Sequence, residues 1–479
     1  MMLIVASAAI VLQFIVFKIL YPYAGFIDGD SYVYLQSAFL NLDINTYPVG
    51  YSKFLRLFSV FTKSDTALVA FQYLFIQASA LFFIFSLFYI FNPKRSAKWL
   101  VFFFVVFNPL FLYLSNYVSS DSIFLGQSLI WFTLLLWIIR SPTLKLAIIH
   151  AVILLLAFSV RYNALYYPLI AALAFTLSSQ RLRVKLLDIG MSIVLILCFI
   201  TYTSNKYKSY LGFTQFTPFT GWQMANNALY AYRYVDSSHR KTPPVQFREI
   251  DKMVTTYFDT TRDIRKHPDE MWMASTVYMW SPFSPLQRYM NSKFKHDSIA
   301  PREKKWASMS PFFKSYGEYI IKQYPLQFAE FYLWPNLQKY YAPPIEFLSS
   351  YNSGEDSVHA IAQVWFGFST NRVRTAFKSL KVSALNFLPI FSGVMNVIFI
   401  VGFLSFYILN GFRQPDKSQS KIMLLGFTLW IVNFGFSVFA SPVTLRYQSF
   451  PILVFTAFSI LLLDYIVKLA FSTKQTAQA

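Results

Sequence analysis

Long apolar stretches recur along the chain and are separated by short polar connections. Each stretch approaches the roughly 20 residues that an α-helix needs to cross the hydrocarbon core of a bilayer. Ten such stretches predict ten transmembrane helices: 2–20, 66–91, 99–114, 122–139, 146–160, 162–179, 186–203, 386–410, 422–440 and 450–470. The pattern therefore indicates an all-α polytopic membrane protein. We interpret the first stretch as an uncleaved helix, because it has no basic segment at its start.

Lysine and arginine are distributed unevenly among the connections, and this predicts the orientation in the membrane. Alternate connections are basic, whereas 115–121 has no Lys or Arg and 441–449 has only Arg446. Basic connections stay on the cytoplasmic side. The basic set is Lys94, Arg95, Lys98, Arg140, Lys145, Arg181, Arg183, Lys185, Arg413, Lys417, Lys421, Lys468 and Lys474. We therefore expect a multi-pass protein of the plasma (inner) membrane with both termini in the cytoplasm.

The stretch 146–179 carries Arg161 near its middle. A single tilted helix would place this guanidinium group near the bilayer centre, at a cost of about 3 kcal/mol or more. It would also reverse the side of every later connection. Two short helices with Arg161 at an outer turn avoid both problems, and Pro168 then predicts a kink early in the second helix.

Two segments on the predicted outer side are longer than a turn. The first is 21–65, and the second, 204–385, is the size of a domain. The chain therefore divides into an N-terminal transmembrane module (1–203), an extracytoplasmic domain (204–385) and C-terminal transmembrane helices (386–479). We expect a mainly helical domain that packs over the first outer segment, because its many Tyr, Trp and Pro residues favour short helices and irregular turns.

The composition agrees with this class of protein. Apolar residues make up 56% of the chain and charged residues 13%, whereas a soluble protein carries about 25% charged residues. The net charge of +20 would indicate nucleic acid as the partner of a soluble protein. Here the surplus lies in the basic connections and the outer domain, so we expect a lipid bilayer and no nucleic acid. The single Cys198 excludes an intrachain disulfide.

Charged residues near the membrane gather on the predicted outer side. Two outer segments supply carboxylates and two outer turns supply guanidinium groups: Asp28, Asp30, Asp121, Arg161 and Arg446. A carboxylate at such a site acts as a general base towards a hydroxyl. Arginine binds phosphate with two parallel hydrogen bonds and stabilises it as a leaving group. The residues therefore predict a transferase whose donor is a lipid-linked phosphate, with Gly29 permitting a tight turn between the first two aspartates.

The predicted cytoplasmic side offers no site for a soluble nucleotide. The chain has neither a Walker-type phosphate loop nor a dinucleotide fingerprint, and the cytoplasmic connections are short. We therefore do not expect an ATP-driven pump or an enzyme that uses a nucleotide sugar. An ion-coupled transporter would show charges in the middle of its helices together with internal repeats, and the sequence has neither.

Several of these motifs resemble the GT-C superfamily of polytopic glycosyltransferases. The first outer segment carries Asp30, Tyr34 and Ala38 at helical spacing in DSYVYLQSA, and the aromatic stretch YPVGYSKFLRLFS follows. Further matches are Asp121 in SNYVSSDSIFL, Arg161 in VRYNALYYPLI and the Arg-Tyr pair of PVTLRYQSFP. The chain is most similar to family 39, which includes protein O-mannosyltransferases and lipid A aminoarabinose transferases. The resemblance covers about the first 180 residues best.

The resemblance implies a donor with its sugar on a polyprenyl phosphate, and a lipid, glycan or protein as acceptor. It also implies an inverting reaction with an aspartate of the first outer segment as general base. Asp30 fits this role better than Asp28, but both stay candidates, because Ser31 follows Asp30 where family members often have Asp-Glu. Some members require a divalent metal ion and others do not, so Asp28, Asp30 and Asp121 are its candidate ligands.

Further residues are assigned by their place on the outer side. Arg161 and Arg446 would bind the donor phosphate, and Asp121 would be a second acidic residue or an acceptor contact. Candidate substrate contacts are Tyr34, Lys53, Arg56 and Tyr447, with Asn226, Asn227, Tyr230 and Arg233 in the outer domain. Two alternatives stay open: an enzyme of the polysaccharide polymerase or O-antigen ligase type, and a non-enzymatic lipid or glycan transporter.

Overall fold

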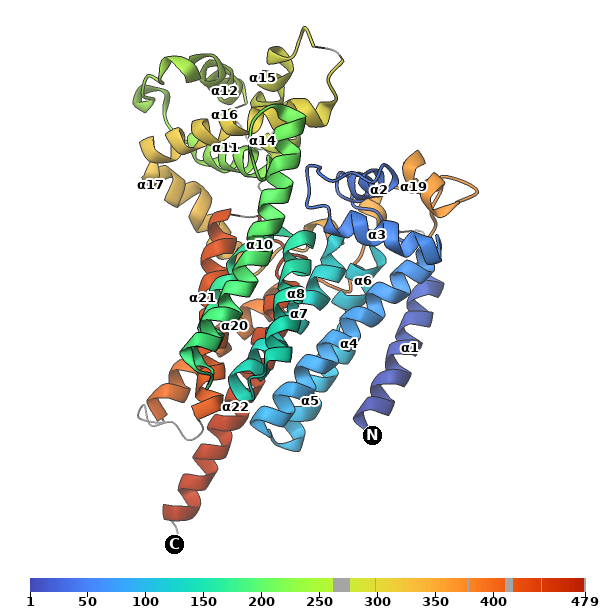
Figure 1. Cartoon of the computed structure of the whole chain (residues 1–479), viewed down its shortest axis with the longest axis vertical. Helices are drawn as coiled ribbons and strands as arrows, with labels where there is room; N and C mark the ends of the chain where they lie inside the picture. The colour runs from blue at the N-terminus through green and yellow to red at the C-terminus, as the bar shows by residue number, and fades with distance from the viewer. Residues whose placement is uncertain (262–275, 298, 377–378, 410–416, 441, 478–479) are drawn as a thin grey trace.

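The chain folds almost entirely into α-helices (Figure 1). The computed structural model describes residues 1–261, 276–297, 299–376, 379–409, 417–440 and 442–477. Within these residues the strand-like pairings are isolated bridges, such as the one between Gly25 and Tyr117. The prediction of an all-α protein is therefore confirmed for the described part of the chain, including the helical character of the long segment between the two groups of apolar helices.

Eight described helices are long and apolar enough to cross a membrane. Their bounds are α1 (Met2–Leu20), α4 (Asp65–Phe91), α5 (Arg95–Val106) continued by α6 (Pro109–Asn116), α7 (Ser120–Arg140), α10 (Leu182–Leu211), α20 (Leu388–Leu409), α21 (Lys417–Ala440) and α22 (Ser449–Ala477). The span formed by α5 and α6 is interrupted because Pro109 starts a new helix, whose first turn is capped by the Asn108 side chain. The fold is that of a polytopic helical membrane protein.

The predicted count of ten spans is wrong by this criterion. The stretches 146–160 and 162–179 form two shorter apolar helices, α8 (Leu144–Val160) and α9 (Tyr167–Leu177), joined by a 3₁₀ turn. The predicted break at Arg161 is confirmed, because this residue has an extended backbone and ends α8. Pro168 lies in the first turn of α9, where its missing N–H costs no hydrogen bond. The break shortens both helices and leaves Arg161 at a helix end.

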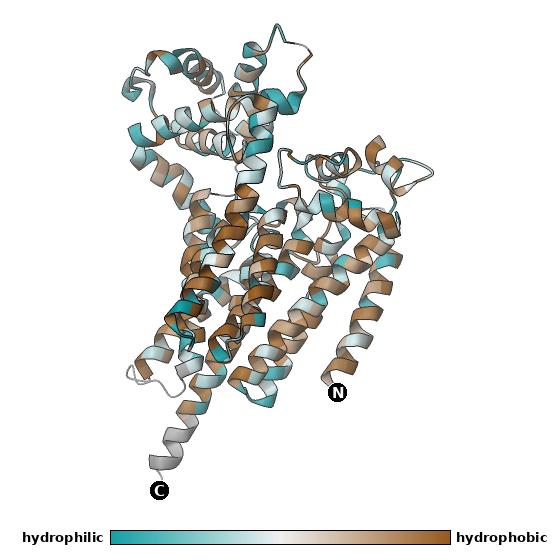
Figure 2. Ribbon diagram, in the orientation of Figure 1, coloured by the Kyte–Doolittle hydropathy of each residue, from teal (hydrophilic) through white to brown (hydrophobic). Residues whose placement is uncertain are grey.

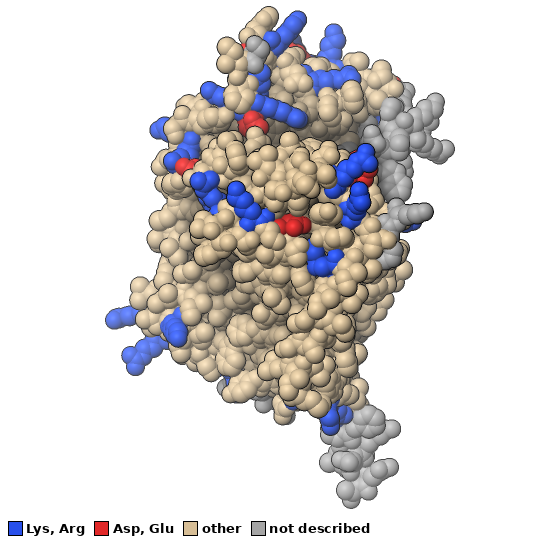
Figure 3. Space-filling model, turned by 90° about the vertical axis from the view of Figure 1, so that its right-hand side faces the viewer, with Lys and Arg blue, Asp and Glu red and all other residues tan. Residues whose placement is uncertain are grey.

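The helix bundle has two distinct ends. The connections 92–94, 141–143 and 178–181 contain or adjoin residues of the basic set, and they lie at one end of the bundle with the start of α1 and the end of α22 (Figure 1). We call this the basic end. There Lys468 Nζ donates a hydrogen bond to the carbonyl of Asn92 at 3.3 Å. Arg413, another member of the basic set, lies outside the described residues. An apolar belt separates the basic end from the opposite end (Figure 2), and charged side chains gather above and below this belt (Figure 3).

The described residues between 212 and 341 form a helical domain beyond the opposite end of the bundle (Figure 1). The domain is reached through α10, which extends past the predicted boundary at 204. Its helices are α11 (Phe219–Tyr232), α12 (Arg248–Thr260), α14 (Val277–Trp280), α15 (Pro285–Lys293), α16 (Arg302–Gln323), α17 (Pro325–Phe328) and α18 (Trp334–Tyr341). The domain has a hydrophobic core of its own, with Trp222, Tyr278 and Phe313 fully buried. This core keeps α11 and α16 in place above the bundle.

The described residues between 342 and 385 do not belong to that core. Leu348, Val382 and Leu385 join the core of the helix bundle. The middle of the segment packs on 21–64, where α19 (Ala360–Phe366) contacts α2 (Ser31–Phe39), which is followed by α3 (Gly50–Phe61). Asn352 Oδ1 accepts a hydrogen bond from the N–H of Phe26 at 3.0 Å, and Ser353 Oγ accepts one from the N–H of Asp28 at 3.1 Å. The segment predicted as one outer domain therefore contains two separate packing units.

Candidate functional site

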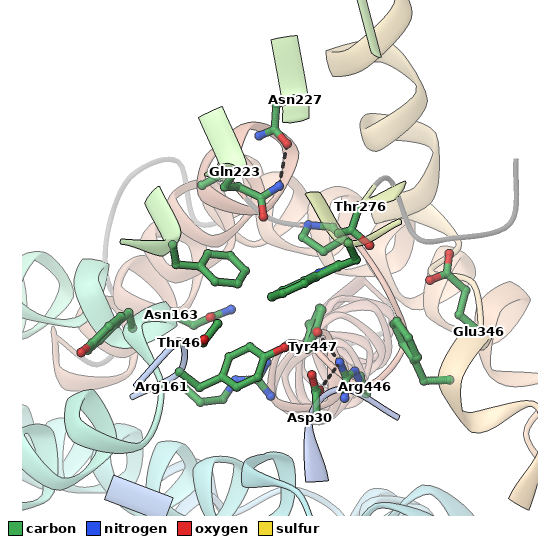
Figure 4. Close-up of a pocket in the computed structure, with 18 of the residues that line it drawn as sticks. Asp30, Thr46, Arg161, Asn163, Gln223, Asn227, Thr276, Glu346, Arg446 and Tyr447 are labelled. Atoms are coloured by element: carbon green, nitrogen blue, oxygen red, sulfur yellow. Dashed lines mark hydrogen bonds and ion pairs between the residues drawn. The ribbon is translucent and has the colours of Figure 1, made fainter. Parts of the chain in front are cut away.

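A cavity of about 1910 Å³ lies between the helix bundle and the helical domain. Part of its lining comes from the segment 28–48 and from the connections that follow α8 and α21. Further lining residues come from α8, α10, α11, α16, α20, α21 and the segments 216–217, 276–283 and 328–353. Figure 4 shows polar side chains from several of these elements pointing towards a common space. The cavity is therefore the place where residues distant in sequence can act on one substrate.

Asp30 lies where the turn after α1 leads into α2. Gly29 has a φ of +79°, which confirms the predicted tight turn between the two aspartates. The Asp30 side chain makes no capping hydrogen bond to α2. It turns instead into the cavity, where its Oδ2 accepts from Arg446 Nη2 at 2.8 Å (Figure 4). The position of this carboxylate is therefore determined by an ion pair and not by helix capping.

Arg446 lies in the connection between α21 and α22 and is only 4% exposed. Its Nη2 pairs with Asp30, and its Nη1 reaches Asp121 Oδ2 at 3.4 Å. Its Nε is buried and has no hydrogen-bond partner within the described part of the chain. A buried guanidinium group is costly unless its charge is paired. The single arginine therefore links two carboxylates, one on the cavity and one behind it.

Asp121 lies in the first turn of α7, behind the two arginines. It is 3% exposed and is not among the described residues that line the cavity. Ser119 Oγ donates a hydrogen bond to its Oδ2 at 3.0 Å, and Arg161 Nη1 forms an ion pair with its Oδ1. Arg161 and Arg446 both line the cavity. Asp121 forms ion pairs with both and therefore holds the two cations from the side away from the cavity.

Aromatic rings hold the two guanidinium groups in place. The ring of Tyr447 lies 4.5 Å from the Arg161 guanidinium carbon and 4.6 Å from that of Arg446. Phe347 covers Arg446 at 4.3 Å. Such cation–π contacts stabilise a partly desolvated cation by about 1–2 kcal/mol. Burial also raises the pKa of Tyr447, although Arg446 opposes the shift, so the phenol stays protonated at neutral pH.

Asp28 lies at the edge of the cavity and differs from Asp30 in its surroundings. It is exposed, and its Oδ1 accepts a hydrogen bond from the N–H of Gly29 at 2.9 Å. No Lys or Arg of the described residues forms an ion pair with it within the 4.0 Å limit. The structure therefore joins Asp30, and not Asp28, to the arginine cluster.

The predicted substrate contacts divide into two groups. Tyr34 and Tyr447 line the cavity, and the Tyr34 hydroxyl lies 3.0 Å from Ser120 Oγ. Lys53 and Arg56 are not among the described lining residues. Arg56 Nη1 donates to the carbonyls of Ala38 and Phe39 at the end of α2, as basic residues do at helix C-termini.

Lys53 has a partner of its own, in the segment between α2 and α3. Its Nζ pairs with Asp43 Oδ1 at 3.0 Å, and Lys206 of α10 pairs with Asp43 Oδ2 at 2.9 Å. Hydrogen bonds from Lys206 and Lys53 lower the pKa of Asp43 to about 2. These contacts attach the segment after α2 to α10, so both predicted basic contacts on α3 have structural roles in this conformation.

The carboxylates do not form a metal site. Among the described residues, no group of three or more His, Cys, Asp or Glu side chains is arranged to hold a metal ion. Arg446 lies between Asp30 and Asp121, where a bridging metal ion would otherwise bind. A cation there would meet the positive charge of this arginine at short range. Asp28, Asp30 and Asp121 thus do not fit a metal ion, and the chemistry below is derived from side chains alone.

Tyr47 and Glu346 are among the cavity residues that the sequence did not reveal. Tyr47 follows Thr46 on the lining, and burial together with the nearby Asp30 carboxylate raises its pKa well above the ordinary value. Glu346 has a φ of +41°, and its buried Oε2 has no hydrogen-bond partner in the described ranges. Burial raises the pKa of Glu346 to about 7, although Lys339 and Arg446 oppose the shift. Tyr47 belongs to a quoted motif, but nothing local in the sequence marks Glu346.

The helix 219–232 contributes only part of the predicted set. Asn227 and its neighbour Gln223 line the cavity (Figure 4). Asn226 accepts a hydrogen bond from the N–H of Met279 inside the domain core, and Arg233 bonds to the Tyr278 hydroxyl at 3.3 Å. Asn226, Tyr230 and Arg233 are not among the described lining residues. They support the domain and leave Asn227 at the cavity.

The fold and the site define a class: a polytopic helical membrane protein whose large cavity contains two arginines, an accessible carboxylate and a supporting buried carboxylate. The chain matches no protein-family model, no curated protein and no solved structure. The functional conclusion must therefore come from the chemistry of the site.

Proposed function

We propose that this protein is an integral-membrane glycosyltransferase that transfers a sugar from a polyprenyl-phosphate donor to an acceptor hydroxyl at the extracytoplasmic face, with inversion. The observation that carries the proposal is the position of Arg446. It pairs with a carboxylate on the cavity and with one behind it, next to a second cavity arginine. This arrangement places a candidate proton acceptor beside a candidate phosphate site.

The two arginines supply the phosphate site. Both reach the cavity, and the buried Nε of Arg446 has a free N–H. The cluster of Arg161, Arg446, Asp30 and Asp121 sums to zero formal charge, so one phosphate can enter without meeting a net negative field. In this low-dielectric setting the arginines stabilise the charge that develops on the leaving phosphate.

The polyprenyl chain would follow the apolar side of the cavity. Phe158, Leu165, Ile200 and Phe439 line this side and come from α8, the turn after it, α10 and α21. Leu165 is 57% exposed and Phe439 is 47% exposed. Apolar side chains with this exposure, next to helices long enough to cross a membrane, suit an isoprenoid tail that enters from the bilayer.

Asp30 would act as the general base. The acceptor oxygen attacks the anomeric carbon, the bond between this carbon and the phosphate oxygen breaks, and the polyprenyl phosphate leaves with the electron pair. The acceptor proton passes to Asp30. The ion pair with Arg446 occupies Oδ2 of Asp30. A donor phosphate that attracts Arg446 would loosen this pair and release the oxygen to accept the proton of the acceptor hydroxyl.

The test is transfer from purified polyprenyl-phosphate sugars, hexoses and pentoses, by the protein in nanodiscs. Asp30→Asn should lower turnover by about 10²–10⁴-fold with little change in the donor KM. Arg446→Ala and Arg161→Ala should lower turnover by about 10²–10³-fold and also raise the donor KM, because the phosphate is present before the transition state. Lys should replace either arginine poorly, since it lacks the planar fork.

Asp28→Asn is the matched control. It removes the same charge as Asp30→Asn, but from an exposed side chain two residues before Asp30. It should retain most of the activity. Near-normal transfer in Asp30→Asn and in the double variant Asp28→Asn/Asp30→Asn would contradict the proposal. If transfer is observed, mass spectrometry of envelope glycolipids and glycoproteins from cells with and without the gene should identify the sugar and the acceptor. The expected signal is a mass difference of one sugar unit.

A further inference from the structure

Three aromatic rings from distant segments form a cluster on the cavity. Tyr47, Phe219 and Trp280 all line it, and each ring is partly exposed. Their centroids form a nearly equilateral triangle: 6.1 Å from Tyr47 to Phe219, and 6.2 Å for both other pairs. We call these three residues the aromatic wall. It joins the segment after α2 to the first turn of α11 and the end of α14.

The orientation of the wall is fixed from behind. Trp306 of α16 lies parallel to Trp280, with centroids 5.8 Å apart, and parallel to Trp222 on its other side at 5.1 Å. Trp222 Nε1 also donates a hydrogen bond to the Trp306 carbonyl at 2.8 Å. The two buried indoles of Trp306 and Trp222 therefore hold the ring of Trp280 in one plane. A flexible lipid tail does not need an aromatic ring of fixed orientation as its contact surface.

Two buried polar atoms beside the wall have no hydrogen-bond partner among the residues that the structure describes. They are Oε1 of Gln223, whose residue is 6% exposed, and Nε1 of Trp306, whose residue is 4% exposed. Both residues line the cavity. A buried polar atom left without a hydrogen bond costs about 1–3 kcal/mol. One acceptor and one donor at the same wall indicate a ligand that supplies both kinds of hydrogen bond.

A network fixes the orientation of the Gln223 amide. Asn227 Nδ2 donates to the carbonyl of Phe439 at 3.3 Å, so Asn227 Oδ1 faces Gln223. Gln223 Nε2 donates to this oxygen at 2.6 Å. The remaining Gln223 oxygen points into the cavity (Figure 4), and is available as an acceptor of fixed position.

We infer that the aromatic wall, with Gln223 and Trp306, is a saccharide-binding subsite that takes one pyranose ring. The C–H face of a pyranose is apolar and packs on an aromatic ring, while its hydroxyls both donate and accept hydrogen bonds around the edge. An isoprenoid tail could satisfy neither Gln223 nor Trp306. The inference rests on the proposed function for its place in the reaction, because Tyr47 lies beside Asp30.

The ring has two possible sources, the transferred sugar of the donor and the terminal sugar of the acceptor. Saturation-transfer NMR distinguishes them, using the full-length protein in nanodiscs and the methyl pyranosides of glucose, galactose, mannose and N-acetylglucosamine. At least one glycoside should receive saturation at its ring C–H protons. Displacement of that signal by a glycosylated polyprenyl phosphate assigns the subsite to the donor sugar. A signal that persists with the donor bound assigns it to an acceptor glycan.

Trp280→Ala should weaken glycoside binding about two- to tenfold, as expected for the loss of one aromatic contact. Gln223→Leu, which keeps the shape of the side chain, should weaken it by a similar factor. Trp99→Ala, on α5 near the basic end, is the control and should bind normally. Absence of saturation for every glycoside, or normal binding in both cavity variants, would overturn the inference. These results do not depend on transfer activity, so they are separable from a failure of Asp30→Asn.

Discussion

At the scale of single residues, the site depends on how buried charges are paired. Arg446 and Asp121 are both nearly inaccessible to solvent, and each would be strongly destabilising alone. Together with Arg161 and Asp30 they form a neutral cluster in which only Asp121 is withdrawn from the cavity. Asp121, which does not line the cavity, thus holds in place the two arginines that we propose as the phosphate site.

Asp121→Asn should therefore affect both stability and binding. It leaves the buried Arg446 and the 15% exposed Arg161 with one carboxylate, and loss of one partner of a buried pair costs about 3–5 kcal/mol. We expect a lower Tm and a higher donor KM. Thermal unfolding in nanodiscs measures the first and transfer kinetics the second.

Asp43→Asn is the control for Asp121→Asn, because Asp43 is paired with Lys53 and Lys206 but is 36% exposed at the side chain. An exposed pair contributes about 0–1 kcal/mol. Equal changes of Tm in the two variants would contradict the supporting role of Asp121.

Glu346 gives a prediction for pH dependence. Its ordinary pKa is 4.5 and burial raises it to about 7 in the folded protein. The folded chain therefore binds this proton more tightly than the unfolded chain, so its contribution to stability is present below pH 4.5 and is lost as the pH rises through about 7. At pH 8, Glu346→Gln should have a higher Tm than the wild type. The gain in the free energy of unfolding should be at most about 3 kcal/mol.

The two proteins should differ little in Tm below pH 4.5. Glu355→Gln, in the same connection, removes an equal charge from an exposed side chain and should behave like the wild type at both pH values. A constant difference between Glu346→Gln and wild type across this pH range would show that the burial of Glu346 does not control its ionisation.

At the scale of elements, the position of the cavity wall depends on one close helix crossing. Gly221 of α11 faces the backbone carbonyl of Ser310, and Gly317 of α16 faces the backbone of Met224. A Cβ at either glycine would overlap these backbone atoms. The two helices can approach this closely only because neither glycine has a side chain, and Gln223 and Trp306 reach the same cavity as a result.

Gly221→Ala should separate α11 from α16. Overpacking of this kind costs about 1–3 kcal/mol, so we expect a lower Tm and faster proteolysis within residues 212–261. Gly190→Ala is the matched control, since a Cβ there meets no atom within 4 Å. The same proteolysis rate in both variants would contradict the close crossing.

At the scale of the whole molecule, the basic connections and both termini lie at one end, and the cavity and helical domain lie at the other (Figure 1). Basic connections face the cytoplasm in most membrane proteins. The cavity should then open on the extracytoplasmic side, where lipid-linked sugars would meet acceptors outside the cell.

Cysteine labelling tests this orientation in a Cys198→Ser background, which removes the single native thiol. An impermeant maleimide on intact cells should label Ser238→Cys, in the helical domain. It should label Ser179→Cys, next to Gln180 at the basic end, only after permeabilisation. Ser179 and Ser238 are both exposed to solvent. Labelling of Ser179→Cys from outside with none at Ser238→Cys would reverse the topology.

The sequence by itself determined the class of the protein, because helix length and apolarity are local properties that the bilayer selects. It also determined the break at Arg161 and the turn at Gly29, since a charge within an apolar run and a glycine between polar residues constrain the backbone locally. Asp30, Arg161 and Arg446 were predicted as separate outer residues by the same reasoning.

Only the tertiary structure decided which of these residues act together. Arg446 meets Asp30 and Asp121 across more than three hundred residues of chain, and such a pairing depends on how the helices pack. The same packing withdrew Lys53 and Arg56 to structural partners, separated 342–385 from the helical domain, and brought Glu346 and the aromatic wall to the cavity. Local pattern encodes which face is buried, whereas contacts between distant segments exist only once all the faces are buried together.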